Sequence, residues 1–343
     1  MKRVSGVRYI ATLSIVILTS AIVSVAEASP RLDLIREKGR LTCGVLPRVV
    51  GFSAVDNNGK FSGFEIDICR ALSAAIFGTP DKVAFVIAET VEQFERDDDI
   101  DVVARRLTWT FKREVANRLL FSPIIFFDGA GFLVSAESSV HTPLQMSGQP
   151  VCVHKGSETE ESLEKYFRAN KLELIAVSMP SIAAAADAFF AGRCVALSGD
   201  VSELGALRST RASSPKDFAI LPDMVSKEPL ALLMRQGDDQ FFLIVRWTIY
   251  ALIESEELGI TSSNLDAQLG DANPAIKAFL EQDVETSRVL GLDENWIANV
   301  IKAVGNYGEV FERHFGAASP TKLERGLNRL WTSGGLMYAP PVR

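Results

Sequence analysis

Several patterns that carry chemistry in other proteins are missing from this 343-residue sequence. It has three histidines and four cysteines, without a Cys-x-x-Cys pair or a histidine spacing typical of metal ligands. It has no P-loop, no Gly-x-Gly-x-x-Gly motif after a predicted strand and no Gly-x-Ser-x-Gly motif. We therefore expect no metal and no cofactor. The formal net charge of −7 gives no support to nucleic-acid binding.

The N-terminus has the pattern of a secretory signal peptide. Lys2, Arg3 and Arg8 precede an apolar run over Tyr9–Val25, and Ala26–Ala28 forms a small-x-small cleavage site. The run is short for a membrane anchor, so we expect cleavage after Ala28 and export to the periplasm. The remaining 315 residues have a net charge of −9 and no apolar run approaching the roughly 20 residues of a membrane helix.

All four cysteines lie in this exported part of the chain, at Cys43, Cys69, Cys152 and Cys194. An even number of cysteines in an oxidising compartment predicts two disulfides. Four cysteines allow three pairings, among which sequence alone cannot choose. Their spacing favours bridges between near neighbours, with one bridge in each half of the pattern described next.

Strands and helices alternate twice along the exported chain. One series covers residues 40–104 and the second covers residues 150–221, and each combines short apolar runs with helical periodicity. Such alternation predicts α/β units with mostly parallel sheets. Extended segments at 129–134 and 229–235 connect the two series, and mostly helical sequence follows them.

The sequence therefore predicts an α/β protein with two lobes that are hinged by two crossings. We expect lobe 1 to comprise residues 29–134 plus 229–343, including a helical C-terminal extension, and lobe 2 to comprise residues 135–228. A cleft between hinged lobes is a common place for a small ligand.

Side chains near predicted strand ends are candidates for lining such a cleft. Arg113 could offer a bidentate fork to a carboxylate, or be an ordinary surface arginine. Ser157 begins a helix whose N–H groups could bind an anion, and it also suits a capping box with Glu160. Asp200 could accept an ammonium or cap a helix, and Phe52 could form a cleft wall or pack in the core.

Many short segments between residues 31 and 343 resemble those of one protein family, and they follow in the same order. The sequence is similar to the general L-amino-acid-binding periplasmic proteins of ABC-type amino-acid uptake systems. The segments that carry the resemblance are Thr42–Val45, Gly51–Ala54, Asp67–Ala71, Thr108–Thr110, Phe127–Gly129 with Gly131–Phe132, Gly192–Cys194, Ser226–Leu230, Arg235–Gln240, Val245–Thr248, Lys302–Glu309 and Gly335–Pro341.

The resemblance implies a type II periplasmic binding protein fold that closes on an L-amino acid and delivers it to an ABC permease. It implies that Arg113 holds the α-carboxylate, helped by Thr108 and the backbone at Ser157, and that Asp200 holds the α-ammonium. It also implies the Cys43–Cys69 and Cys152–Cys194 pairings. We expect a monomer that is not an enzyme and has no nucleic-acid partner.

The sequence departs from the family pattern near the expected ligand. Arg105-Arg106-Leu107 stands where the family has Arg-Asn-Thr, Glu158 interrupts a run of threonines, and Val195 replaces an aspartate. The loop over Leu46–Val50 is bulkier and more basic than usual. Because Arg106 and Glu158 bring opposite charges, we expect an altered specificity, for a ligand with an extra charged group.

Two other functions remain open from sequence. Binding-protein folds also host lyases, and Glu158 could serve as a general acid in a dehydratase-like reaction. No histidine or second carboxylate is placed beside it by a motif, which disfavours this alternative. A divergent amino-acid sensor that does not transport its ligand has the same sequence features as a transport receptor.

Overall fold

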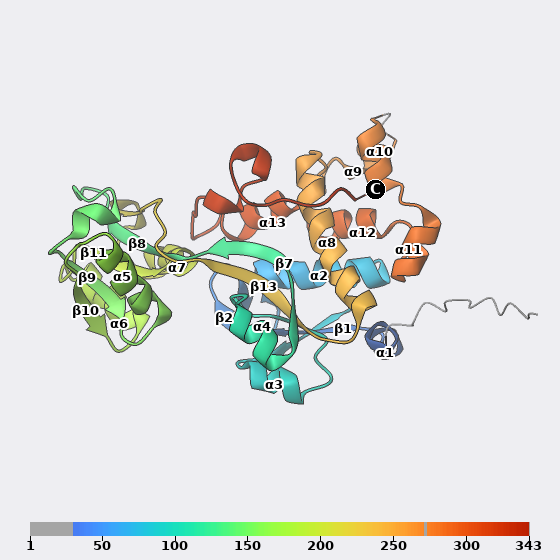
Figure 1. The fold of residues 1–343 in the computed structure, drawn as a ribbon. Helices are drawn as coiled ribbons and strands as arrows, with labels where there is room; N and C mark the ends of the chain where they lie inside the picture. The colour runs from blue at the N-terminus through green and yellow to red at the C-terminus, as the bar shows by residue number, and fades with distance from the viewer. Residues whose placement is uncertain (1–29, 271–272, 343) are drawn as a thin grey trace, which may run out of the picture.

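Two lobes joined by two long strands make up the protein (Figure 1). The structure is a computed structural model that describes residues 30–270 and 273–342. The predicted signal peptide and its cleavage site after Ala28 lie outside these residues. Within the described ranges, no helix is both long and apolar enough to cross a membrane. The predicted two-lobed α/β fold with a helical C-terminal extension is confirmed.

The first part of lobe 1 contains both short and long elements. They are α1 (Pro30–Lys38), β1 (Leu41–Val45), β2 (Arg48–Val49), β3 (Ser53–Val55), β4 (Phe61–Ser62), α2 (Phe64–Phe77), β5 (Val83–Ile87), α3 (Val91–Arg96), β6 (Val102–Ala104), α4 (Phe111–Asn117) and β7 (Leu119–Asp128). The chain returns to this lobe with β13 (Glu228–Arg235) and α8 (Asp239–Glu257).

A five-stranded sheet with the order β5-β1-β6-β13-β7 forms the centre of lobe 1. All five residues of β1 are buried, as expected for a parallel strand covered on both faces. On the face covered by α2, an aromatic cluster joins Phe52, Phe64, Phe126 and Phe315. A separate apolar cluster around Phe94 of α3 covers the opposite face.

Lobe 2 contains a second five-stranded sheet, with the order β10-β9-β11-β8-β12. Its elements are β8 (Ala130–Ser135), β9 (Pro150–His154), α5 (Glu158–Ala169), β10 (Ile175–Met179), α6 (Ile182–Phe190), β11 (Ala196–Asp200), α7 (Val201–Arg211) and β12 (Phe218–Ile220). Val151 and Val153 pack with Leu163 and Phe167 of α5, whereas Cys152 faces the cluster with α6 and α7. This sheet is therefore also covered on both faces.

The crossings between the lobes lie at Gly129 and just before Glu228. The expected lobe 1 boundary at residue 134 is wrong, because residues 130–134 of β8 pair with β11 and residues 133–135 pair with β12, and both of these strands belong to lobe 2. An extended segment does not reveal its pairing partners in sequence. At Gly129, a Cβ atom would lie 2.6 Å from the carbonyl oxygen of Ser226, so the two crossings approach closely only because this residue is glycine.

The C-terminal extension covers the helical side of lobe 1 (Figure 1). Its helices are α9 (Leu265–Gln268), α10 (Pro274–Leu280), α11 (Val284–Leu290), α12 (Trp296–Val304) and α13 (Tyr307–His314). Buried residues of α12, such as Ile297 and Ile301, belong to the same core as α2 and α8. The Tyr307 hydroxyl donates to the carbonyl oxygen of Ile125 at 3.0 Å, which fixes the extension to β7.

After α13, the C-terminal tail (residues 315–342) returns to the region between the lobes. The Asn328 side chain pairs with the Phe127 backbone in β7, accepting from its N–H at 2.7 Å and donating to its carbonyl at 3.0 Å. From lobe 2, Arg208 of α7 donates to the carbonyl oxygens of Thr321 and Lys322 at 2.7 and 2.9 Å. The tail therefore contacts both lobes.

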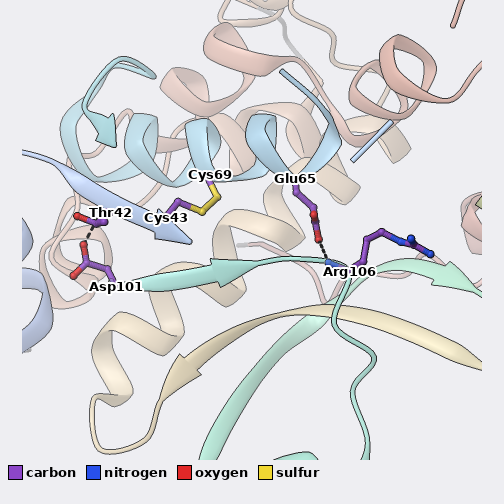
Figure 2. Close-up of a disulfide and its surroundings, with 6 residues drawn as sticks. All are labelled: Thr42, Cys43, Glu65, Cys69, Asp101 and Arg106. Atoms are coloured by element: carbon purple, nitrogen blue, oxygen red, sulfur yellow. Dashed lines mark hydrogen bonds between the residues drawn. A yellow bond between two sulfur atoms is a disulfide. The ribbon is translucent and has the colours of Figure 1, made fainter. Parts of the chain in front are cut away.

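Each lobe contains one disulfide. In lobe 1, Cys43 of β1 is bonded to Cys69 of α2, which joins the sheet to the helix above it (Figure 2). In lobe 2, Cys152 of β9 is bonded to Cys194, which precedes β11. These are the near-neighbour pairs that the sequence spacing favours, and neither bond connects one lobe to the other.

Candidate functional site

A cavity of about 390 Å³ lies between the two lobes. Thr108 and Glu228 line it from the lobe 1 side, and the remaining lining residues come from lobe 2. Those lobe 2 residues are His154, Ser157, Glu158, Thr159, Ile182, Ser198, Gly199, Asp200 and Glu203. We call this space the interlobe cavity. Its volume lies in the range of small-molecule sites, about 300–1,000 Å³.

On the lobe 1 side, Arg113 lies in the first turn of α4. The Thr110 side chain caps this helix by accepting from the Arg113 N–H at 3.3 Å. The Arg113 guanidinium donates to the Thr108 carbonyl at 2.9 Å, and the side chain stays 33% exposed. Thr108 donates its hydroxyl proton to Glu228 at 2.7 Å. The structure thus brings Arg113 and Thr108 together, with part of the guanidinium fork open to the cleft.

On the lobe 2 side, Ser157 caps α5, and its hydroxyl oxygen accepts from the Glu160 N–H at 3.2 Å. Glu160 in turn accepts from the Gly156 N–H at 2.6 Å, so the helix start is held from both sides. The first N–H groups of a helix have no intrahelical partner and attract anions. Glu158 lies 3.9 Å from the Arg113 guanidinium across the cleft, and its side chain is 73% exposed. Ser157 therefore caps the helix as expected, but the reciprocal bond of the predicted capping box is absent, because Glu160 accepts from Gly156 instead of from the Ser157 N–H. Anion binding at this helix start stays a prediction.

Asp200 is the N-terminal flanking residue of α7, yet its side chain does not cap the helix. Asp128, at the end of β7, does so instead, because its carboxylate accepts from both the N–H and the hydroxyl of Ser202. Because it does not cap the helix, the carboxylate of Asp200 is available to pair with a cation. The sequence places Asp200 at a cap position, but it has no local signal for the capping role of Asp128, which depends on a contact across 74 residues of sequence.

Arg106 provides that cation in the structure. Its guanidinium Nη2 lies 2.9 Å from Asp200 Oδ2 and 3.7 Å from Asp128 Oδ2. Its guanidinium carbon lies 5.2 Å from the centre of the Phe52 ring. Arg106 follows β6 of lobe 1 and Asp200 belongs to lobe 2, so this ion pair connects the lobes across the cleft.

Phe52 is fully buried and belongs to the aromatic cluster of lobe 1. Its core role is therefore clear, although it also borders a second cavity of about 240 Å³ between Arg48–Val50 and α7. The bulky Leu46–Val50 loop thus faces lobe 2. Of the other departures from the family pattern, Glu158 lines the interlobe cavity. Leu107 and Val195 pack in apolar clusters and do not line it.

Two acidic groups near Arg106, Asp200 and Glu203, have pKa values above their ordinary range. Burial, together with the nearby charge of Asp128, raises the pKa of Asp200 to about 7, although Arg106 opposes this change. Burial also raises the pKa of Glu203 above its ordinary range. Burial lowers the pKa of Arg106, but the charges of Asp128 and Asp200 outweigh this effect and raise it. The guanidinium therefore keeps its charge, while Asp200 titrates near neutral pH.

Two lobes with a polar cavity at their junction define a solute-binding protein. The sequence model of the bacterial extracellular solute-binding proteins, family 3, matches residues 41–263, and the chain belongs to this family. The C-terminal extension lies beyond the matched residues. Similarity to individual proteins covers more of the chain than the family model does, 91–94% of its residues.

The chain is 44% identical over 322 residues to the general L-amino acid-binding periplasmic protein AapJ of Rhizobium johnstonii, covering 93% of this chain and 94% of AapJ. It is 39% identical over 327 residues to the glutamate/glutamine/aspartate/asparagine-binding protein BztA of Rhodobacter capsulatus, covering 94% and 96%. A periplasmic binding protein from Brucella ovis, solved with glutathione bound, superimposes with a TM-score of 0.78 at 42% identity, covering 91% of this chain and 99% of that one.

Proposed function

We propose that this protein is a periplasmic receptor that captures an L-amino acid between its lobes and delivers it to an ABC permease. The observation that carries the proposal is the interlobe cavity, which Thr108 of lobe 1 lines together with Ser157 and Asp200 of lobe 2. Relatives that match nearly the whole chain are named as amino-acid-binding proteins of such transporters. Export to the periplasm, a monomeric state and lack of catalysis are parts of the same proposal.

In this proposal, Arg113 holds the α-carboxylate with its bidentate fork, together with Thr108 and the N–H groups that follow Ser157. These groups already lie on facing sides of the cleft, where the 3.9 Å approach of Arg113 to Glu158 brings α4 close to α5. Asp200 then accepts the α-ammonium from the lobe 2 side. A ligand that contacts both lobes favours the closed arrangement over the open one.

The charged groups of the cavity also indicate the sign of the extra charged group that we expect on the ligand, in addition to its α-carboxylate and α-ammonium. Among its lining residues, which all fall within the described part of the chain, are four carboxylates and no lysine or arginine. These carboxylates belong to Glu158, Asp200, Glu203 and Glu228. Arg113 and Arg106, beside the cavity, pair with Glu158 and Asp200. The excess of negative charge therefore comes from Glu203 and Glu228. We propose that the extra charged group of the ligand is positive, because a cationic side chain offsets this excess whereas an acidic one adds to it.

Calorimetric titration with the twenty L-amino acids and with glutathione tests the proposal. We expect submicromolar to micromolar binding of L-lysine, L-ornithine or L-arginine, and much weaker binding of L-glutamate, L-aspartate and glutathione. Mass spectrometry of small molecules released from the denatured protein provides an independent result. Equal binding of many neutral amino acids contradicts the charge assignment, and binding of none contradicts the receptor function.

The lyase alternative has less support. Glu158, its candidate acid, is largely exposed and pairs with Arg113 rather than with a histidine or a second carboxylate. The relatives with high identity are named as binding proteins. A turnover assay with prephenate-like acids decides the question, and we expect no product above the uncatalysed rate.

A further inference from the structure

The proposed ammonium site already contains a cation from the protein itself. Arg106 Nη2 lies 2.9 Å from Asp200 Oδ2, a distance typical of a charge-assisted hydrogen bond. A ligand ammonium that binds Asp200 needs the same carboxylate. Arg106 and an α-ammonium therefore compete for one acceptor.

The backbone holds Arg106 in this competing position. Its φ angle is 52°, in the left-handed region that residues other than glycine and asparagine rarely adopt. Its N–H donates to Oε1 of the buried Glu65 at 2.6 Å, and Figure 2 shows its side chain extending away from that contact. The side chain thus leaves lobe 1 in a fixed direction, toward Asp128 and Asp200.

The Arg106 guanidinium keeps other favourable contacts when it separates from Asp200. Asp128 lies 3.7 Å from the same nitrogen, and the face of Phe52 lies under the guanidinium. A buried cation with a second carboxylate and an aromatic face remains paired, which lowers the cost of exchange. The exchange therefore separates one ion pair without leaving an isolated buried charge.

We propose that Arg106 is an intramolecular occupant of the ammonium site and that a ligand binds by displacing it from Asp200. This inference rests on the proposed function, because it takes Asp200 as the ammonium acceptor. It makes Arg106 a specificity-determining residue. Ligands with an α-ammonium spend part of their binding free energy on the exchange, whereas analogues without one bind beside an intact Arg106–Asp200 pair and avoid this cost.

The test compares the wild type with R106N, because asparagine tolerates the left-handed backbone and keeps the N–H bonded to Glu65. R105N is the matched control: Arg105 is the neighbouring arginine, and its guanidinium donates to the Glu89 carbonyl instead of reaching the cleft. After removal of co-purified molecules by unfolding and refolding, each variant is titrated with L-lysine, L-glutamine and L-leucine. Each variant is also titrated with the three corresponding 2-hydroxy acids, in which a hydroxyl group replaces the α-ammonium.

We expect R106N to bind the amino acids at least about tenfold more tightly than the wild type does, without a similar gain for the hydroxy acids. R105N should match the wild type. The inference is overturned if the ratio between hydroxy-acid and amino-acid dissociation constants is unchanged or smaller in R106N. If no variant binds any of the six compounds, the proposed function fails together with the inference. Should R106N not fold, R106G, which adopts the left-handed backbone without strain, provides the same comparison.

Discussion

Glu65 of α2 accepts a 2.6 Å hydrogen bond from the backbone N–H of Arg106, and this contact connects a core helix to the cleft. Glu65 is almost completely buried, and its Oε2 atom has no hydrogen-bond partner among the residues that the structure describes. Burial raises its pKa to about 7, although Arg106 lowers it in part. The carboxyl group that positions Arg106 therefore changes protonation near neutral pH.

The first prediction concerns stability and pH. Because the pKa of Glu65 rises from an ordinary 4.5 to about 7 on folding, the folded protein binds this proton more tightly than the unfolded chain. The free energy of unfolding should therefore fall between pH 4.5 and 7, by up to about 3 kcal/mol from this group. E65Q keeps an acceptor oxygen but does not titrate. Urea unfolding at pH 5 and pH 8 should show a smaller loss in E65Q, and equal losses would contradict the assignment.

The second prediction concerns Asp200 and ligand affinity. An ammonium binds the ionised carboxylate, and burial places the pKa of Asp200 at about 7 in the free protein. Affinity for amino acids should therefore rise between pH 6 and pH 8 as Asp200 loses its proton. D200N should lose about 10- to 100-fold in affinity, as expected for a charged hydrogen bond, and this pH dependence with it. Calorimetry across this range measures both effects, and a pH-independent wild type would contradict the role of Asp200.

The third prediction concerns the carboxylate end of the cavity. R113K keeps the charge but loses the planar fork, so we expect amino-acid affinity to fall by about tenfold or more. Lys112 is its exposed neighbour, and K112Q provides a control that changes surface charge alone. Titration of both variants with the same amino acids distinguishes the cases. Similar affinities in R113K and K112Q would show that Arg113 is a surface arginine.

The fourth prediction concerns the lobe 2 disulfide. Cys152 and Cys194 are 42 residues apart, and closing a loop of this size in the unfolded chain is worth about 4 kcal/mol in the chain-entropy model. The C152A/C194A variant should be less stable by 2–4 kcal/mol in urea unfolding. Adding a reductant should lower the stability of the wild type more than that of the variant. An unchanged midpoint in the variant would contradict this role.

Much of the fold can be predicted from sequence because its signals are local. The alternating series expected over residues 40–104 and 150–221 form the strands and helices of the two lobes, and the mostly helical sequence expected after residue 235 begins with α8. The pairing of β8 could not be predicted, because an extended segment does not encode which strand it joins. Its six residues belong to lobe 2, although we expected most of them in lobe 1.

The sequence indicates residue types for a candidate site, but not the contacts between them. Arg106 and Glu158 were noted as departures from the family pattern, and both lie at the cleft. The pairing of Arg106 with Asp200 depends on a backbone direction fixed by Glu65, which is 41 residues away in sequence. Long-range packing of this kind leaves no local signal. Asp128 and Glu228 lie in segments that carry the family resemblance, Phe127–Gly129 and Ser226–Leu230, and the sequence gives no further indication of their roles.

The contact between Arg208 and the C-terminal tail has a mechanical consequence. Two crossings alone leave lobe 2 able to rotate about them, but Arg208 adds a third link through Thr321 and Lys322, on a tail that Asn328 holds against β7. Small rotations keep both hydrogen bonds, and rotations larger than the reach of one arginine side chain must break them. Lobe 2 can therefore rotate by a small angle while Arg208 stays bonded to the tail, and it can rotate further only after both of these hydrogen bonds have broken.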